Sequence, residues 1–313
     1  MSKESRPRRG SLQFYPRKRT AKVLPSVNWS TIEHKVPGLL GIIAYKAGMG
    51  TAIIKDSTDK VMTSGKQMAI PVTILEVPAM KIYSVRFYKF GKVMGEIVVS
   101  HDKELKRKIK VAKQLKGLDH APKDYDDLRV IIYSLPKQTS IKKTPDIIEV
   151  AVAGDNKLEF VKSLVGKELS LEDFPKFDIL DVRGVTRGKG FQGPTKRFGL
   201  KLKNHKTEKG VRRPGSLGPW HPARVTFKAP QAGQMGYFSR IIYNIRVISS
   251  GKIKDKNINP VTGFRNYGNI KTSYIILKGS VQGPEKRQIL LTPAFRPSKL
   301  QMKKKYEFLE LLA

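Results

Sequence analysis

The sequence predicts a mainly β protein with an α+β insertion and long basic extensions. Short β-rich runs bounded by Gly, Pro and Ser recur in two separate parts of the chain. Two helical patterns fall between them, and two further stretches are rich in Lys and Arg but poor in apolar residues. The 313 residues are 39% hydrophobic, which is enough to bury a core in one large domain or two moderate ones.

The first β-rich part spans residues 38–100, and the second spans residues 177–292. Strands are predicted in the first part at 39–45, 70–77, 82–90 and 93–99, and in the second at 240–248, 273–277 and 288–291. Strands of this length and spacing are typical of a barrel or a sandwich. We therefore expect these two parts to form one β domain.

The insertion between them spans residues 101–176 and mixes helices with strands. Leu105, Ile109, Ala112 and Leu115 share one helical face, which predicts an amphipathic helix over 102–115. A second helix is predicted over 155–165, and strands over 129–135 and 147–153. Residues 119–181 carry 13 acidic and 9 basic side chains in a chain whose formal net charge is +35. This segment therefore avoids the polyanion that the rest of the chain attracts.

Three basic extensions complete the chain. Residues 1–37 form an arm too poor in periodic apolar residues to fold alone. Residues 187–224 form a central loop within the β domain, with eleven basic residues, one acidic residue, seven glycines and four prolines. Residues 293–313 form a tail that contains Lys303, Lys304 and Lys305 and is expected to end in one turn of helix. A connection as long as the central loop is usually functional or disordered.

Several classes of function are excluded or disfavoured. Residues 188–193 match the pattern GxGxxG, but no helical period and no ribose-binding acid follow, so a dinucleotide site is rejected. Residues 184–190 resemble a P-loop, but the spacer of that motif is one residue short here, so a phosphate-binding P-loop is rejected. The five histidines have no metal-binding spacing, and with no Cys the chain has neither disulfides nor thiolate ligands, which fits a reducing, intracellular compartment. We expect no enzymatic activity, cofactor or small-molecule substrate, and no stretch is long and apolar enough to span a membrane.

What remains is the chemistry of nucleic-acid recognition. Guanidinium and ammonium groups bind phosphates, glycines allow close backbone approach, and aromatic rings stack on bases. Trp220 lies between two Gly/Pro turns and is predicted at an exposed tip, and a buried core position is the alternative. His205 is a further possible contact to a phosphate or a base. The predicted binding residues are Arg8, Arg9, Arg17, Lys18, Arg19, Arg187, Lys189, Lys196, Arg197, Lys201, Lys203, His205, Arg212, Arg213, Trp220, His221 and Arg224.

Eight short motifs occur in order along the chain. They are RGSLQF at residues 9–14, PRKR at 16–19, GLLG at 38–41 with KAGM at 46–49, PVTILE at 71–76, GVTRGKGF at 184–191, WHPAR at 220–224 and AGQMG at 232–236. Together they resemble the universal large-subunit ribosomal protein family called "L three", in its archaeal and eukaryotic form. The resemblance extends over most of the chain.

The resemblance implies a closed Greek-key β-barrel of the translation-protein type and two extensions that thread into large-subunit rRNA. It also implies a role early in subunit assembly and a central loop that approaches the peptidyl transferase centre, with Trp220 near its tip. His205 resembles a loop histidine of the eukaryotic members. The partners implied are large-subunit rRNA and neighbouring ribosomal proteins, in the cytoplasmic ribosome.

The sequence therefore predicts a structural rRNA-binding protein whose arm 1–37 and loop 187–224 become ordered when they dock in RNA. One rival is an RNA-modifying or RNA-cleaving enzyme, which needs catalytic groups in a basic cleft. The other is a nucleoid-type DNA-binding protein, which needs groove-reading helices or repeats. The basic parts of the chain show neither feature.

Overall fold

A computed structural model describes residues 8–32, 34, 36–112, 114–115, 117–122 and 124–312. The chain divides into two compact units. The larger unit contains Val23–Gly184 and Arg240–Ala313, and the smaller one contains Met1–Lys22 and Val185–Ser239. The predicted arm 1–37 is thus shared between them, because Trp29 and Ile32 are buried in the core of the larger unit.

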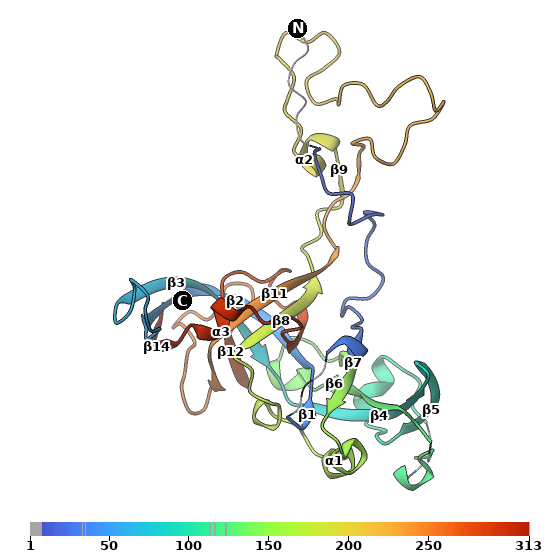
Figure 1. Cartoon of the computed structure of the whole chain (residues 1–313), viewed down its shortest axis with the longest axis vertical. Coiled ribbons are helices and arrows are strands. Elements are labelled where there is room, and N and C mark those ends of the chain that lie inside the picture. The colour runs from blue at the N-terminus through green and yellow to red at the C-terminus, as the bar shows by residue number, and fades with distance from the viewer. Residues whose placement is uncertain are drawn as a thin grey trace. The chain divides into compact units, whose positions relative to one another are not determined.

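The larger unit is built on two antiparallel sheets (Figure 1). The first has seven strands in the order β13-β8-β11-β12-β3-β2-β14, and β13 also pairs with β2, with Leu290 opposite Ile43. Each strand is therefore hydrogen-bonded to the next in the order β13, β8, β11, β12, β3 and β2, and β2 is in turn hydrogen-bonded to β13. These strands are β2 (Ile42–Asp56), β3 (Gln67–Val77), β8 (Ile179–Val185), β11 (Ser239–Lys252), β12 (Ser273–Lys278), β13 (Gln288–Pro293) and β14 (Tyr306–Leu312).

The central strands β3 and β12 of this sheet are buried on both faces, which explains their nearly continuous apolar runs. Successive side chains of a strand point to opposite faces. Leu75 and Ile275 accordingly join one core cluster, whereas Ile74 and Ile276 join another. β-Branched residues suit strands that pack on both sides.

The second sheet has five strands in the order β1-β7-β6-β4-β5. It shares the first core cluster with the seven-stranded sheet, because Phe87, Val130 and Val150 belong to that cluster together with Leu75. Its strands β4 and β5, which the sequence grouped with the β-rich part 38–100, pair next to β6 instead. The strands are β1 (Gly38–Leu39), β4 (Met80–Lys89), β5 (Lys92–Val98), β6 (Asp127–Ser134) and β7 (Ile147–Ala153).

The mainly β class is confirmed, and every predicted strand corresponds to an observed one. The helix predicted over 155–165 is confirmed as α1 (Lys157–Leu164), with Val161 buried. The remaining short elements of the larger unit include the 3-10 turns η1 (Trp29–Thr31), η2 (Lys103–Arg107), η3 (Leu118–His120), η4 (Pro136–Thr139) and η5 (Leu171–Asp173).

The amphipathic helix predicted over 102–115 is wrong. Among the described residues of this range only η2 forms, with Leu105 buried against Tyr133 and Leu135. Ala112 and Leu115 are exposed. Most helical stability in proteins comes from packing of the apolar face, and here Leu105 is buried and Ile109 partly buried in the same cluster while the second half of the face stays exposed.

The C-terminal tail also differs from its prediction. A helical turn is present as α3 (Lys299–Lys303), but strand β14 follows it, so the tail does not end in a helix. β14 pairs with β2, with Tyr306 opposite Asp56. Glu307 and Glu310 are three residues apart because a β-bulge lies between Phe308 and Glu310, so the sequence of this strand lacks the period-two alternation that would have marked it.

Two buried polar clusters hold the strands of the larger unit in register. Tyr45 of β2 donates a 2.6 Å hydrogen bond to Asp146 and lies 2.8 Å from the Ser134 hydroxyl of β6, which joins the two sheets. Glu76 of β3 accepts hydrogen bonds from Tyr267, from the Lys271 and Thr272 backbone N–H groups and from the Thr272 hydroxyl. Burial raises the pKa of Glu76 and that of Tyr267.

Candidate nucleic-acid interface

The smaller unit carries most of the predicted binding residues, and a short ladder forms its base. β9 (Phe191–Gln192) pairs with β10 (Gly233–Gln234). Lys189 N–H donates to the Met235 carbonyl, and Met235 N–H donates to the Gly190 carbonyl, both at 2.9 Å. The two legs of the central loop are therefore tied together at their start.

Gly236 permits this close pairing. Its φ is +71°, and a Cβ added there would lie 2.1 Å from the Arg187 carbonyl oxygen. Only glycine satisfies both requirements. The last glycine of the AGQMG motif, Gly236, is therefore required by the backbone conformation at this position.

A single helical turn, α2 (Pro194–Phe198), supplies the core of the smaller unit. It begins on Pro194, whose fixed φ suits a first helical position, and it ends at Gly199 with φ +64°. Phe198 is 6% exposed. The Arg17 guanidinium lies 4.4 Å from the centroid of the Phe198 ring, so the N-terminal arm covers the turn.

Arg17 and Arg197 act as internal braces. Arg197 donates to the carbonyls of Gln231 and Gln234 at 3.0 Å and to that of Arg17 at 3.3 Å. Arg17 donates in return to the Arg197 carbonyl at 3.4 Å, and it also donates to the Ser11 carbonyl at 3.2 Å. Burial, and then the neighbouring Arg17, lower the pKa of Arg197. The geometry shows a cross-linking role for these two residues, and their contact with RNA stays a prediction.

Other residues of the arm also pack on the central loop. The rings of Tyr15 and Phe227 meet edge to face with centroids 5.3 Å apart. Arg8 donates a 2.7 Å hydrogen bond to the Lys228 carbonyl, and Thr20 N–H donates to the Tyr237 carbonyl at 3.0 Å. Two extensions far apart in the sequence therefore form one unit.

The other fifteen predicted binding residues are exposed. They are Arg8, Arg9, Lys18, Arg19, Arg187, Lys189, Lys196, Lys201, Lys203, His205, Arg212, Arg213, Trp220, His221 and Arg224. Residues 8–22 and 185–239 together hold eighteen Lys and Arg residues and one acid, Glu208. Across these described residues no ion pair forms, so their charge faces solvent without internal neutralisation.

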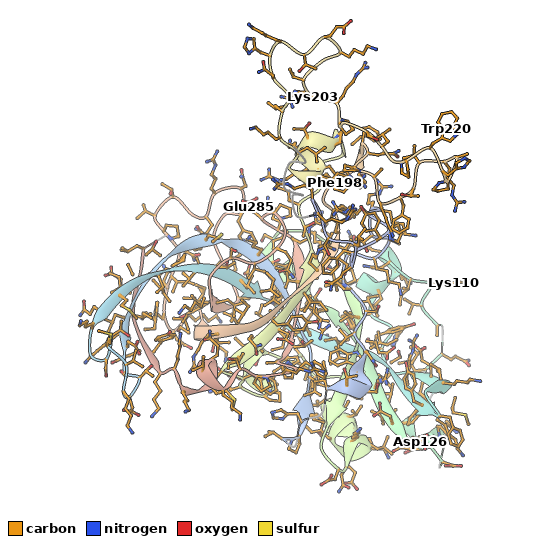
Figure 2. All side chains as sticks on the ribbon, turned by 45° about the horizontal axis from the view of Figure 1, so that its top comes forward. Lys110, Asp126, Phe198, Lys203, Trp220 and Glu285 are labelled. Atoms are coloured by element: carbon orange, nitrogen blue, oxygen red, sulfur yellow. The ribbon has the colours of Figure 1, made fainter. Side chains whose placement is uncertain are left out.

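Trp220 is 88% exposed, which confirms the predicted exposed position and contradicts the core alternative (Figure 2). It borders a surface groove of about 360 Å³ that Leu217, Pro219, Pro222 and Val225 also line. The peptide bond between His221 and Pro222 is cis. The ring therefore presents a flat apolar face on a loop of basic residues, which suits stacking on a base.

Sequence reasoning missed several exposed residues of this unit. Phe191 is 77% exposed, and Lys206, Lys209 and Lys228 are exposed cations. Phe191 lies between glycines in GKGFQG, and an aromatic residue without apolar neighbours is the same signal that identified Trp220. All four belong to the unit that carries the predicted binding residues.

The rejected chemistries find no support in the geometry. The GxGxxG stretch leads into β9 and the five-residue α2, and not into the long helix that a dinucleotide site requires. Within the described ranges, no group of three or more His, Asp or Glu residues could hold a metal ion. The described helices also include none that is long and apolar enough to cross a membrane.

A mainly β body with a basic unit that exposes its cations and a tryptophan is typical of the class of proteins that bind polyanions. Comparison with known proteins gives the family. The sequence model described as "Ribosomal protein L3" matches residues 1–311, and the chain belongs to that family.

Similar proteins named "Large ribosomal subunit protein uL3" occur in archaea. The protein of Methanococcus vannielii is 42% identical over 313 residues, which cover 95% of this chain and 93% of that protein. The protein of Methanocaldococcus jannaschii is 40% identical over 311 residues, covering 94% and 92%. That of Methanococcoides burtonii is 40% identical over 314 residues, covering 93% and 92%.

Family membership confirms the resemblance drawn from the eight motifs. It makes the chain a structural component of the large ribosomal subunit, located in the cytoplasmic ribosome, and not an enzyme. The first rival, an RNA-modifying or RNA-cleaving enzyme, is therefore wrong.

Proposed function

We propose that the smaller unit binds large-subunit rRNA through its phosphates. The supporting observation is the excess of eighteen basic residues over one acid, without an internal ion pair in the described part of this unit. Each phosphate that a Lys or Arg neutralises releases counterions, which gives binding its free energy and its salt dependence. Glycines 188, 190 and 193 let backbone N–H groups approach the same phosphates.

The arm and the loop then organise RNA by bridging crowded phosphates with cations. Trp220 would stack on an unpaired base, and Arg212 and Arg213 would flank its strand. We place the central loop toward the peptidyl transferase centre and assign the chain an early role in subunit assembly, as the family resemblance implies. Any effect on peptide-bond formation would be indirect, because the loop offers positioning groups and no general acid or base pair.

The larger unit serves as the anchor for these extensions. The pairing of β13 with both β8 and β2 supports a closed Greek-key barrel of the translation-protein type. We propose that the seven-stranded sheet forms the barrel domain, from the predicted ranges 38–100 and 177–292 together with β14 of the predicted tail 293–313, whereas β4 and β5 of the first range belong to the five-stranded sheet with β6 and β7 of the α+β insertion 101–176. The acidic residues 119–181 would face protein neighbours in preference to RNA.

The salt dependence of rRNA binding tests this proposal. Full-length chain is titrated with a large-subunit rRNA fragment at several salt concentrations, with the double variant Arg212→Ala/Arg213→Ala beside the original. Two lost phosphate contacts should reduce the slope of log K against log salt by about 1.4 to 1.8.

The matched control removes two exposed cations from the acidic segment, Lys143→Ala and Lys167→Ala. That variant should bind with an unchanged slope. Equal losses in both double variants would contradict the assignment of binding to the smaller unit.

A further inference from the structure

A cavity lies at the base of the smaller unit, where the N-terminal arm meets the central loop. It has a volume of about 360 Å³, and Met235 and Phe238 form an apolar part of its lining. Four cationic side chains also line it, namely Arg17, Arg187, Lys189 and Arg197. Among the described residues no carboxylate lines the cavity, and the one acid in residues 8–22 and 185–239, Glu208, lies elsewhere in the loop.

The Arg197 guanidinium is held in a fixed position in this lining. It donates three hydrogen bonds to backbone carbonyls, at 3.0 to 3.3 Å. A Cβ added at Gly233 would lie 3.0 Å from Arg197 Cζ, and the centroid of the Phe198 ring lies 5.3 Å from the same atom. The backbone and the ring thus fix the guanidinium before a ligand arrives, which lowers the entropic cost of binding.

Arg17 is the direct neighbour of Arg197, and each of them donates to the other residue's carbonyl. Neither forms an ion pair with a residue that the structure describes. Burial, and then the charge of Arg17, lower the pKa of Arg197. Two like charges held together cost electrostatic free energy unless an anion lies close to them. A guanidinium has five N–H groups, and the hydrogen bonds use three on Arg197 and two on Arg17, so both keep donors for a ligand.

The other two cations are exposed, on a backbone that is fixed. Within the described part of the chain, the Arg187 and Lys189 side chains make no hydrogen bond or ion pair. Lys189 N–H, in contrast, donates to the Met235 carbonyl at 2.9 Å, and the Arg187 carbonyl packs tightly against Gly236. These two side chains are therefore free to close over a ligand that Arg17 and Arg197 hold.

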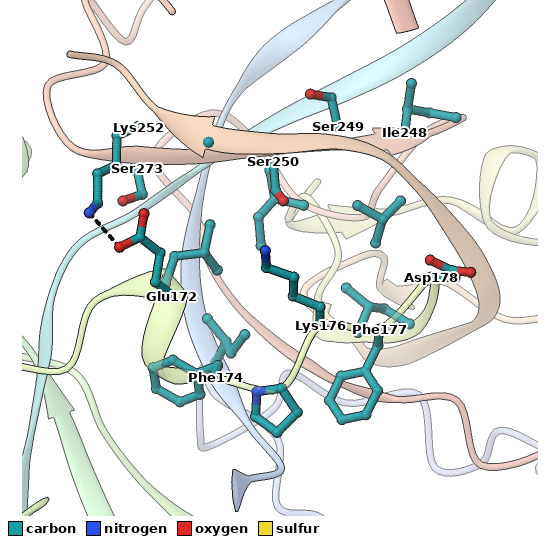
Figure 3. Close-up of a pocket in the computed structure, with 17 residues that line it drawn as sticks. Glu172, Phe174, Lys176, Phe177, Asp178, Ile248, Ser249, Ser250, Lys252 and Ser273 are labelled. Carbon is teal, nitrogen blue, oxygen red and sulfur yellow. Dashed lines mark hydrogen bonds and ion pairs between the residues drawn. The ribbon is translucent and has the colours of Figure 1, made fainter. Parts of the chain in front are cut away.

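A groove beside β11 in the larger unit shows the opposite arrangement. There Lys252 pairs with Glu172 at 2.6 Å (Figure 3), and Arg246 lies 3.6 Å from Asp178. Charges of opposite sign neutralise each other at that groove, so it selects no ligand by charge. The cavity of the smaller unit has four cations and no internal counter-charge, so an anion from outside has to neutralise it.

We propose that this cavity is a binding site for one phosphate-class anion, which ties the N-terminal arm to the central loop. Arg17 and Arg197 hold the anion through charge-assisted N–H donors, and Arg187 and Lys189 neutralise its remaining charge. Met235 and Phe238 reduce the polarity around it, which strengthens the attraction. The anion is either a phosphodiester of rRNA, which rests on the proposed function, or free phosphate. The site itself rests on the cavity and its four cations.

Hydrogen exchange of the free, full-length chain tests the site without RNA. The exchange rates of the Lys189 and Met235 amides, which donate across the base of the loop, are measured in sodium phosphate and in sodium chloride of equal ionic strength. Phosphate should slow both rates at least about fivefold, because an anion that binds only the closed base stabilises it. Equal rates in the two salts would overturn the proposal.

Two variants separate a specific site from the general stabilisation of folded proteins by phosphate, which is excluded from their surfaces. Arg187→Gln/Lys189→Gln removes two lining cations whose side chains hold no other described residue, so the fold is kept and the slowing by phosphate should disappear. Lys206→Gln/Lys209→Gln removes two exposed cations that do not line the cavity, and the slowing should remain. Equal slowing in the original chain and both variants would refute a specific site.

Competition with rRNA identifies the source of the anion once phosphate has been shown to slow exchange. The original chain is titrated with a large-subunit rRNA fragment in the same two salts. A lower rRNA affinity in phosphate means that an RNA phosphodiester occupies the cavity, whereas equal affinities mean that free phosphate stays bound beside the RNA. If the chain binds no rRNA, the proposed function fails while the exchange result stands, so the two failures are distinguishable.

Discussion

The Arg17 guanidinium lies 4.4 Å from the centre of the Phe198 ring, although the two residues come from the two separate sequence segments of the smaller unit, Met1–Lys22 and Val185–Ser239. A cation over an aromatic face contributes about 0.5 to 2 kcal/mol, and this contact covers the buried ring of α2. Gly10 completes it, because a Cβ there would lie 2.7 Å from both Arg17 and Phe198. The arm and the central loop therefore stabilise each other.

This relationship predicts that the base of the smaller unit is ordered in the free chain. Amide protons of Lys189 and Met235 should be protected, because both donate within the ladder. Residues 201–224 should exchange fast until rRNA binds, as the composition of the loop leads us to expect. Hydrogen exchange of the full chain with and without rRNA measures both. Equal protection of 201–224 in the two states would contradict RNA-dependent ordering.

Arg17→Ala should loosen the base of the smaller unit selectively. The variant loses the ring contact and the hydrogen bond to the Ser11 carbonyl, and we expect local opening to become easier by about 1 to 3 kcal/mol. Exchange at Lys189 and Met235 should accelerate, while β3 and β12 of the larger unit keep their protection. Lys18→Ala, which removes an exposed neighbouring cation, is the control and should leave the exchange pattern as it was.

The two tryptophans should respond in opposite ways to substitution. Trp29 is 3% exposed and donates a 3.0 Å hydrogen bond to the Glu149 carbonyl, so Trp29→Ala should lower the free energy of unfolding by about 3 to 5 kcal/mol. Trp220→Ala should leave stability within about 0.5 kcal/mol but reduce rRNA affinity by about 1 to 3 kcal/mol through lost stacking. Denaturant unfolding and rRNA titration measure the two effects. A loss of stability in Trp220→Ala would argue for a structural ring.

Tyr45→Phe should weaken the junction between the two sheets. It removes the hydroxyl that donates to Asp146 and contacts Ser134, and it leaves a buried carboxylate with fewer partners. The expected loss is about 1 to 3 kcal/mol. A double-mutant cycle with Asp146→Asn should show that the two losses are not additive. Additive losses would mean that the hydroxyl and the carboxyl are energetically independent.

Glu76 should make stability depend on pH. Burial raises its pKa in the folded chain, so between the unfolded pKa near 4.5 and the raised folded value the native state binds more protons than the unfolded state. The contribution of Glu76 is therefore most favourable below the unfolded pKa and declines as pH rises through the folded pKa. Each unit of pKa difference corresponds to about 1.4 kcal/mol.

Glu76→Gln isolates this effect, since the amide keeps an oxygen for the Lys271 and Thr272 donors but does not titrate. The difference in unfolding free energy between the original chain and the variant should shift in favour of the variant as pH rises across that window. A constant difference would show that the folded pKa of Glu76 is not raised.

Strands could be predicted well from the sequence because their apolar, β-branched runs end at clear Gly and Pro signals. The run that forms β7 is recognisable without tertiary information, whereas the pairing of β4 with β6 depends on contacts that no local pattern encodes. The helix predicted over 102–115 fails for the same reason, because packing of its apolar face depends on tertiary contacts. Leu105 is buried in such contacts, whereas Leu115 is exposed.

The exposed basic residues of the smaller unit were predictable from the charge of the sequence, but the structural roles of Arg17 and Arg197 were not. Arg17 and Arg197 look like their neighbours in the sequence, and only the fold shows that their donors are used by backbone carbonyls. The exposed position of Trp220 was predictable from its lack of apolar neighbours, and the structure exposes it while burying Trp29.

The central claim is that this chain is an integral, rRNA-bound component of the large subunit. Sedimentation of a native lysate through a sucrose gradient after a high-salt wash tests it most directly. Stoichiometric retention of the chain with large subunits is the predicted result, because extensions enclosed by folded rRNA and held by stacking stay bound when salt weakens their phosphate contacts. Release of the chain to the top of the gradient would contradict the claim.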